Sequence, residues 1–295
     1  MKESNRKKKS FWNFILIPIL EFVILFIVGY ALGPALLEGI LSHYIKDGTL
    51  LHSLSKISIW ITIIIYCLII KPDRKVLRAL GTKIKGNNIK NAFVGLLFGL
   101  GINALLILIA YIHKDISLHL SPEAGIDLAG MLGVSFLVTL ISSSGEELLM
   151  RGFMYQRFRA CSKYPVIAIL IPSVLFAVLH LGNPGITVSA FINIILCGIL
   201  LALMIHFFDS FWMACLWHAG WNFSQAYLFG LPSSGVSKEF SLFKLDSAVA
   251  RDSFAYNVGF GIEATALTSI ILAIIIVAML IYGIKNKKQP TPVWE

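Results

Sequence analysis

Residues 142–152 read SSSGEELLMRG and place two adjacent carboxylates and an arginine inside a strongly apolar stretch. The preceding run, residues 131–141, has the composition of a membrane helix, and the following run, residues 153–158, is still largely apolar and aromatic. An ionisable side chain at bilayer depth costs several kcal/mol unless it is paired or faces water. We therefore expect this stretch to organise both the fold and a functional site.

The spacing of the three charges predicts two different roles. Glu147 and Arg151 are four residues apart, so on a helix their side chains can pair. Glu146 points about 100° away from Glu147 around the same helix and can stay free for chemistry. The alternative is a charge cluster at the end of a membrane helix, with Arg151 reaching the lipid headgroups.

The composition predicts an all-α fold, a polytopic membrane helical bundle. Apolar residues make up 57% of the chain and charged residues 14%, and the mean hydropathy is +0.80. Several apolar runs of about twenty residues are long enough to cross a bilayer, and they lack the two-residue alternation of barrel strands. We expect a multi-pass protein of the cell membrane, in contact with the lipid bilayer.

About eight transmembrane helices are predicted. They cover residues 11–32, 57–70, 92–112, 128–159, 166–181, 188–208, 211–229 and 262–284. Residues 1–127 then form an N-terminal region of about three membrane spans. Residues 128–229 form a helical core that contains the charged stretch, and residues 230–295 form an extracytoplasmic loop and the last span.

The lysines and arginines predict that both termini are cytoplasmic. They concentrate at residues 2–9, in the loop 71–90, after the fourth span and at the C-terminal end, which an eight-span chain puts on one side. Short loops rich in lysine and arginine stay in the cytoplasm. These loops explain the net charge of +9, so no nucleic acid is expected as a partner.

Two further predicted spans carry polar side chains at a depth similar to that of Glu146. His180 closes the fifth span, and His218 and Asn222 share one face of the seventh because they are four residues apart. At 1.5 Å per residue, all four groups lie about 12–22 Å from the cytoplasmic edge if the fourth helix continues to Arg159. Such a layer offers a carboxylate to activate water and donors for an oxyanion, which peptide hydrolysis needs.

Three motifs follow one another on the fourth, fifth and seventh predicted helices: Glu146-Glu147-x-x-x-Arg151, Phe176-x-x-x-His180 and His218-x-x-x-Asn222. Together they resemble the signature of the CPBP family, the CAAX-protease and bacteriocin-processing (Abi) intramembrane proteases. The resemblance covers about residues 128–229. It implies an all-helical membrane bundle with a catalytic cavity inside the bilayer, and we expect this cavity to open toward the cytoplasm.

The resemblance also implies a catalytic or supporting role for each motif residue. Glu146 would act as general base on a water molecule that His180 helps to hold. His218 and Asn222 would stabilise the oxyanion of the tetrahedral intermediate. The Glu147–Arg151 pair would support the site by keeping the motif helix in place.

We therefore expect an intramembrane endopeptidase that hydrolyses a peptide bond of a membrane-associated, prenylated or peptide-precursor substrate. Two alternatives stay open: a non-catalytic membrane immunity or scaffold protein of the same family, and a proton-coupled transporter that uses the same buried groups. The sequence requires no cofactor, but a divalent metal such as zinc would find three ligands in Glu146, His180 and His218. No His-Glu-x-x-His helix supports such a metal site.

Overall fold

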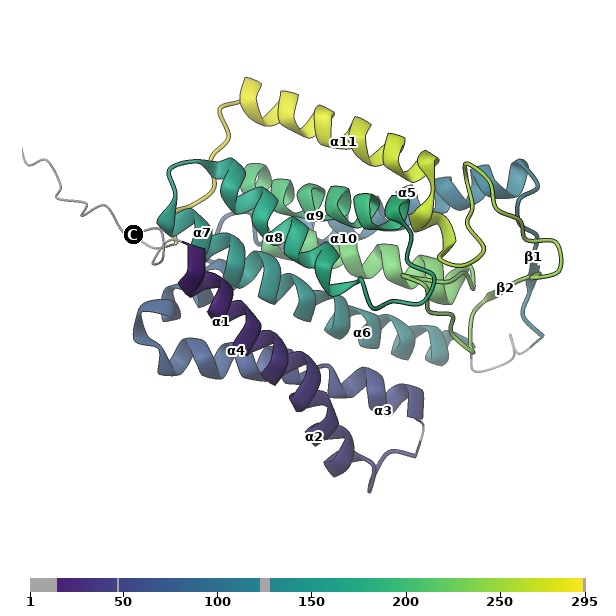
Figure 1. Cartoon of the computed structure of the whole chain (residues 1–295), viewed down its shortest axis with the longest axis horizontal. Helices are drawn as coiled ribbons and strands as arrows, with labels where there is room; N and C mark the ends of the chain where they lie inside the picture. Colours follow the sequence, from purple (N-terminus) through teal and green to yellow (C-terminus); the bar gives the residue numbers. More distant parts are fainter. Residues whose placement is uncertain (1–14, 47, 123–127, 294–295) are drawn as a thin grey trace, which may run out of the picture.

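The computed structural model describes residues 15–46, 48–122 and 128–293. Over these residues the chain is a bundle of helices with one small two-stranded sheet at one end (Figure 1). The sheet corrects the all-α prediction in one detail, because β1 (Leu118–Leu120) and β2 (Phe243–Leu245) pair antiparallel. Strands this short carry too little alternation to be recognised in a sequence.

The first long helix of the N-terminal region ends later in the chain than the sequence predicts. Its elements are α1 (Ile17–Phe26), η2 (Ile27–Leu32), α2 (Gly33–Leu41), α3 (Gly48–Ser55), α4 (Ser58–Ile69), η3 (Lys71–Leu80) and α5 (Ile89–Ile112). Helices α1 and α2 join through the π-helical turn η2 into one helix, Ile17–Leu41. Pro34 lies just after the π-helical turn η2, and the helix continues past it although this residue supplies no N–H.

The central region contains the predicted long fourth helix. Its elements are α6 (Leu128–Glu147), η4 (Leu148–Met154), α7 (Tyr155–Cys161), α8 (Pro165–Leu179), α9 (Val188–Phe208), α10 (Phe211–Phe223) and η5 (Ser224–Leu228), and the chain ends with η6 (Gly261–Ala264) and α11 (Ala266–Lys285). The run α6–η4–α7 is one helical segment, Leu128–Cys161. It therefore continues through the two glutamates instead of ending at a membrane surface beside them.

Side-chain caps mark where four of the helices begin. Asn88, Thr187, Ser210 and Thr265 each precede a helix, and each side-chain oxygen accepts a hydrogen bond from the backbone N–H three residues later. Such caps satisfy one of the unpaired N–H groups at a helix start. They set the starts of α5, α9, α10 and α11 and with them the register of the side chains that follow.

Helices α5 and α10 pack backbone to backbone. A Cβ atom on Gly95 would lie 2.3 Å from the carbonyl oxygen of Met213, and one on Gly99 would lie 2.2 Å from that of Trp217. Only glycine allows this approach, which is a common way of joining helices in membranes. Because α10 carries His218 and Asn222, the glycines of α5 hold one wall of the site in place.

Five helices in the described part of the chain are long and apolar enough to cross a membrane: Ile17–Leu41, Ile89–Ile112, Leu128–Cys161, Val188–Phe208 and Ala266–Lys285. The apolar helices α4 and α8 are shorter. Large apolar side chains point outward from the long helices, among them Leu36, Phe93 and Ile281, which are 68%, 57% and 62% exposed. A lipid environment is where such surfaces are stable.

The two ends of the bundle differ in what they carry. The N-terminal end of α1 and the C-terminus of the chain lie at one end, and the strands lie at the other (Figure 1). Ala79 and Ile84 of the basic loop pack with Val293 near the C-terminus, so this loop belongs to the same end as the C-terminus. The predicted basic segment 2–9 lies outside the described residues.

Candidate active site

Glu146 lies near the middle of the long α6–α7 segment and lines a cavity of about 440 Å³. Its Oε1 accepts a hydrogen bond of 2.5 Å from the hydroxyl of Tyr30, and its Oε2 lies 3.9 Å from Nε2 of His218. The side chain is 17% exposed, so the carboxylate faces the cavity and is not packed into the core. A carboxylate in this position can accept a proton from a water molecule.

Glu147 and Arg151 form the predicted pair. Arg151 Nη1 lies 3.1 Å from Glu147 Oε1, and both side chains are fully buried. The guanidinium also donates a 2.9 Å hydrogen bond to the carbonyl of Gly198 on α9, and it stands 4.8 Å from the centre of the Phe176 ring on α8. Arg151 therefore connects the motif helix to two neighbouring helices, which fits the supporting role predicted for this pair.

His218 contacts both glutamates from α10. Its Nδ1 lies 2.9 Å from Glu147 Oε1, and because a carboxylate only accepts hydrogen bonds, Nδ1 carries the proton. Nε2 points into the cavity toward Glu146. Glu147 thus does more than pair with Arg151, because it also fixes the orientation of the His218 ring.

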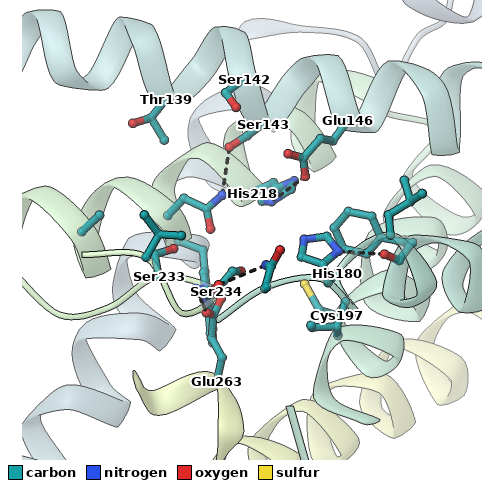
Figure 2. Close-up of a pocket in the computed structure, with 18 of the residues that line it drawn as sticks. Thr139, Ser142, Ser143, Glu146, His180, Cys197, His218, Ser233, Ser234 and Glu263 are labelled. Carbon is teal, nitrogen blue, oxygen red and sulfur yellow. Dashed lines mark hydrogen bonds and ion pairs between the residues drawn. The ribbon is translucent and has the colours of Figure 1, made fainter. Parts of the chain in front are cut away.

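Asn222 lies one turn after His218 and lines the same cavity. Its Nδ2 donates a 3.1 Å hydrogen bond to the hydroxyl of Ser143 on α6 (Figure 2). One hydrogen of the amide group is used in this bond, and the other is free to donate to a bound group. Ser143 therefore sets the direction in which the amide of Asn222 points.

His180 caps the C-terminal end of α8, as the sequence predicts for the end of the fifth span. Its Nδ1 lies 2.8 Å from the carbonyl oxygen of Phe176, so Nδ1 is the donor and Nε2 keeps a free lone pair in the neutral ring. Figure 2 shows the ring beside the cavity into which Glu146 and His218 also project. The four predicted catalytic side chains thus line one cavity from three helical segments.

The cavity reaches the end of the bundle that carries the strands. Its lining includes Lys56, Asn183 and Lys238, which belong to connections at that end, whereas the basic loop lies at the opposite end of α4. If the termini are cytoplasmic, as predicted, the cavity opens away from the cytoplasm. The predicted cytoplasmic opening and the predicted cytoplasmic termini therefore conflict. Counting residues from the cytoplasmic edge of each predicted helix does not show at which end the cavity opens.

Sequence reasoning missed several cavity residues outside the three motifs, among them Tyr30 and Glu263. Tyr30 comes from the π-helical turn η2 and holds Glu146. Glu263 comes from η6, where its carboxylate accepts hydrogen bonds from Trp221 Nε1 at 3.0 Å and from the backbone N–H of Ser234. Burial raises the pKa of Glu263. A tyrosine or glutamate in a region without a motif gives no signal of this kind in a single sequence.

Three π-helical turns surround the site. Turn η2 carries Tyr30, η4 carries Arg151, and η5 follows directly after Asn222 and Phe223. Such turns widen a helix by one residue and are frequent at functional sites. They let these helices present a polar side chain inward without ending the helix.

Glu146, His180 and His218 are the possible metal ligands that the sequence offers. The described residues contain no group of three His, Cys, Asp or Glu side chains placed to hold a metal ion. Nδ1 of His180 and Nδ1 of His218 each donate to a protein acceptor, so each ring keeps Nε2 as its one possible ligand atom, as metal-binding histidines commonly do. As placed, however, Glu146, His180 and His218 are not grouped as three ligands of one ion would be.

Comparison with known proteins identifies the core of the chain. Residues 128–224 match the family model described as type II CAAX prenyl endopeptidase Rce1-like, which confirms the resemblance drawn from the three motifs. A curated protein, the uncharacterized protein YyaK of Bacillus subtilis (strain 168), is 41% identical over 54 residues, which cover 18% of each of the two chains. The chain thus aligns with less than a fifth of that relative's length. No solved structure matches the chain.

The fold and the family match together define a class of protein. The chain is a multi-pass membrane protein, and its residues 128–224 are similar to the Rce1-like type II CAAX prenyl endopeptidases. All three motifs lie inside these residues: the first spans α6 and η4, the second closes α8, and the third lies on α10.

Proposed function

We propose that this protein is an intramembrane endopeptidase that hydrolyses a peptide bond with a water molecule activated by Glu146. The observation that carries the proposal is the convergence of Glu146, His180, His218 and Asn222 on one cavity from three helical segments. The cavity volume of about 440 Å³ lies in the range of small-molecule and peptide sites. The family match to CAAX prenyl endopeptidases supports the same reaction class.

The mechanism begins with water between Glu146 and His180. Glu146 takes one proton from the water, while Nε2 of His180 accepts its second hydrogen as a hydrogen bond and holds it in place. The water oxygen attacks the peptide carbonyl carbon, and the carbonyl oxygen becomes an oxyanion. Glu146 then delivers its proton to the leaving nitrogen as the C–N bond breaks.

The oxyanion is stabilised from α10. The free amide hydrogen of Asn222 donates to it, and Nε2 of His218 donates as well when the ring carries both protons. Each donor placed in a water-poor site can contribute a few kcal/mol to the transition state. Glu147 acts as a positioning residue, because it holds Nδ1 of His218 at 2.9 Å.

The substrate is a membrane-associated protein or peptide precursor, including lipidated ones. Its peptide chain has to reach a cavity that lies within the helical bundle, which favours a segment held at the membrane by an apolar or lipid anchor. We also propose that the chain crosses the bilayer eight times with both termini in the cytoplasm.

The orientation is tested by labelling single cysteines in whole cells, in a background without the native cysteines. Lys83→Cys in the basic loop and Ser237→Cys near the cavity mouth should lie on opposite sides of the membrane. An impermeant reagent outside the cell should label only the second position. Equal labelling of both positions would contradict the eight-span orientation.

The reaction is tested with purified protein in proteoliposomes. Wild-type protein and the variant Glu146→Gln are incubated with a mixture of membrane-derived peptides, and new termini are identified by mass spectrometry. General base catalysis contributes about 10²- to 10⁴-fold, so the variant should lose at least about 100-fold of the cleavage rate. The exposed Glu239→Gln serves as a control and should cleave like wild type. Equal cleavage by Glu146→Gln would contradict the proposal.

A further inference from the structure

Two lysines stand where the cavity meets the loops. Lys56 precedes α4, and Lys238 lies in the connection between η5 and β2. Both are half-buried and both line the cavity that contains Glu146. Neither belongs to the three motifs, and the proposed mechanism uses neither of them.

The two lysines lack a direct partner in the described part of the chain. No hydrogen bond or ion pair joins either ammonium group to a described residue. The carboxylates that line the cavity are already engaged: Glu146 with Tyr30, and Glu263 with the Trp221 side chain and a backbone N–H. Two half-buried positive charges are therefore left without a partner beside a candidate site.

The two lysines are close enough to repel each other. Burial and the neighbouring charge of Lys56 lower the pKa of Lys238. The charge of Lys56 also acts on Glu146, so this lysine lies within electrostatic reach of the candidate base. Like charges brought together without a directly paired carboxylate favour a bound anion.

The segment that carries Lys238 is held in position. Ser233 and Val236 form a bridge by two backbone hydrogen bonds of 3.0 Å, and the N–H of Ser234 binds the buried carboxylate of Glu263. The N–H of Leu242 binds the carbonyl of Tyr227 at 2.8 Å, which fixes the far end of the same segment. A charge on a tethered segment loses less entropy when it binds a ligand than one on a free loop.

We propose that Lys56 and Lys238 form an anion subsite that binds a carboxylate of the substrate peptide, either its free C-terminus or an acidic side chain. This inference rests on the proposed function and adds a specificity determinant to it. The bound carboxylate would fix how far the peptide enters the cavity and thus which bond lies beside Glu146. A peptide without a carboxylate in reach of the two lysines would enter without this restraint.

The test uses matched peptides that differ in one charge. An apolar fluorescent peptide that the wild type cleaves is made with a free C-terminus, with an amidated C-terminus, and with glutamate or glutamine near the end. In one of these two peptide pairs, we expect the wild type to prefer the carboxylate form over its amide by about ten-fold in kcat/KM, as for a hydrogen bond to a charged group. In Lys56→Gln/Lys238→Gln this ratio should fall toward one. Which peptide pair shows the ratio identifies the source of the carboxylate.

The matched control is Lys46→Gln. Lys46 is exposed, contacts only the carbonyl of Ser42, and does not line the cavity, so its removal should leave the preference unchanged. The proposal is overturned if the double lysine variant prefers carboxylate peptides as strongly as wild type does. It is equally overturned if the double variant differs from wild type only in the amount of anionic lipid that co-purifies with it, because the subsite then binds a headgroup.

A binding measurement separates this proposal from the proposed function. Fluorescence anisotropy of the same peptides on Glu146→Gln protein, with and without the lysine substitutions, needs no cleavage. One outcome is that the wild type cleaves none of the peptides, and yet the carboxylate peptides bind about ten-fold more tightly through the lysines. In that case the subsite stands and the protease proposal fails. If the carboxylate and amide forms bind equally, the subsite is wrong whether or not cleavage occurs.

Discussion

Glu146 and Glu147 are neighbours in the chain, yet they occupy two different regions of the molecule. Glu146 faces the cavity, is 17% exposed and, among the described residues, has only the hydroxyl of Tyr30 within hydrogen-bond distance. Glu147 is fully buried against Arg151 and the Nδ1 side of His218. One residue along a helix turns the side chain by about 100°. This turn separates a carboxylate that can exchange protons with water from one that is held between Arg151 and His218.

This difference shows how a membrane helix can combine chemistry and stability in one turn. The buried pair ties three helices together, and the cavity side stays open to a ligand. Substitutions on the buried side should therefore change the stability of the fold, and substitutions on the cavity side should change the rate of cleavage.

The largest effect is expected on the buried side. Arg151→Met leaves Glu147 with an uncompensated buried charge and should lower the free energy of unfolding by about 3–5 kcal/mol. Thermal unfolding in detergent measures this change. The control is Arg251→Met. Arg251 is 60% exposed, and the buried Asp115 keeps the Ser253 hydroxyl and His113 as partners, so this change should cost about 1 kcal/mol or less.

The double variant sharpens the same comparison. Adding Glu147→Gln to Arg151→Met removes the stranded charge, so the double variant should be more stable than Arg151→Met alone. If Arg151→Met unfolds at the same temperature as Arg251→Met, the buried pair does not hold the helices together as described.

On the cavity side, Asn222→Ala should have the next largest effect. Removing a donor to the oxyanion lowers kcat by about 10²- to 10³-fold in comparable sites. Steady-state cleavage of a substrate peptide measures it, and the unfolding temperature should change little. Ser143→Ala, which removes the acceptor that orients the Asn222 amide, should lower kcat by a smaller factor. If Asn222→Ala keeps the wild-type kcat, Asn222 does not donate to the oxyanion.

The smallest effect is expected for Tyr30→Phe. This change removes the hydrogen bond that holds Oε1 of Glu146, and the loss of one such bond should lower kcat by about five-fold. Tyr44→Phe is the control, because Tyr44 is 83% exposed and does not line the cavity. Equal activity of the two variants would mean that Tyr30 does not position the base.

The motif helices were the part of the fold that could be predicted from the sequence. The continuation of the fourth helix, the Glu147–Arg151 pair and the shared face of His218 and Asn222 all follow from spacings along one helix. Such spacings depend only on helix geometry, so they survive without knowledge of how the helices pack.

Contacts between distant helices could not be predicted. Tyr30 reaches Glu146 across 116 positions, and Glu263 reaches Trp221 from a region that no motif marks. In a membrane helix both the lipid-facing and the buried sides are apolar, so hydrophobic periodicity does not say which side faces the interior. The end at which the cavity opens depends on these packing contacts, so positions counted along single helices do not give it.

The central claim is that Glu146 serves the reaction and Glu147 serves the structure. The most direct test measures kcat per folded molecule for Glu146→Gln and Glu147→Gln in parallel, with the folded fraction taken from unfolding curves of the same samples. The account predicts that Glu146→Gln stays folded and loses at least about 100-fold in kcat, whereas Glu147→Gln loses stability and keeps more activity per folded molecule. A stable but inactive Glu147→Gln beside an active Glu146→Gln would contradict it.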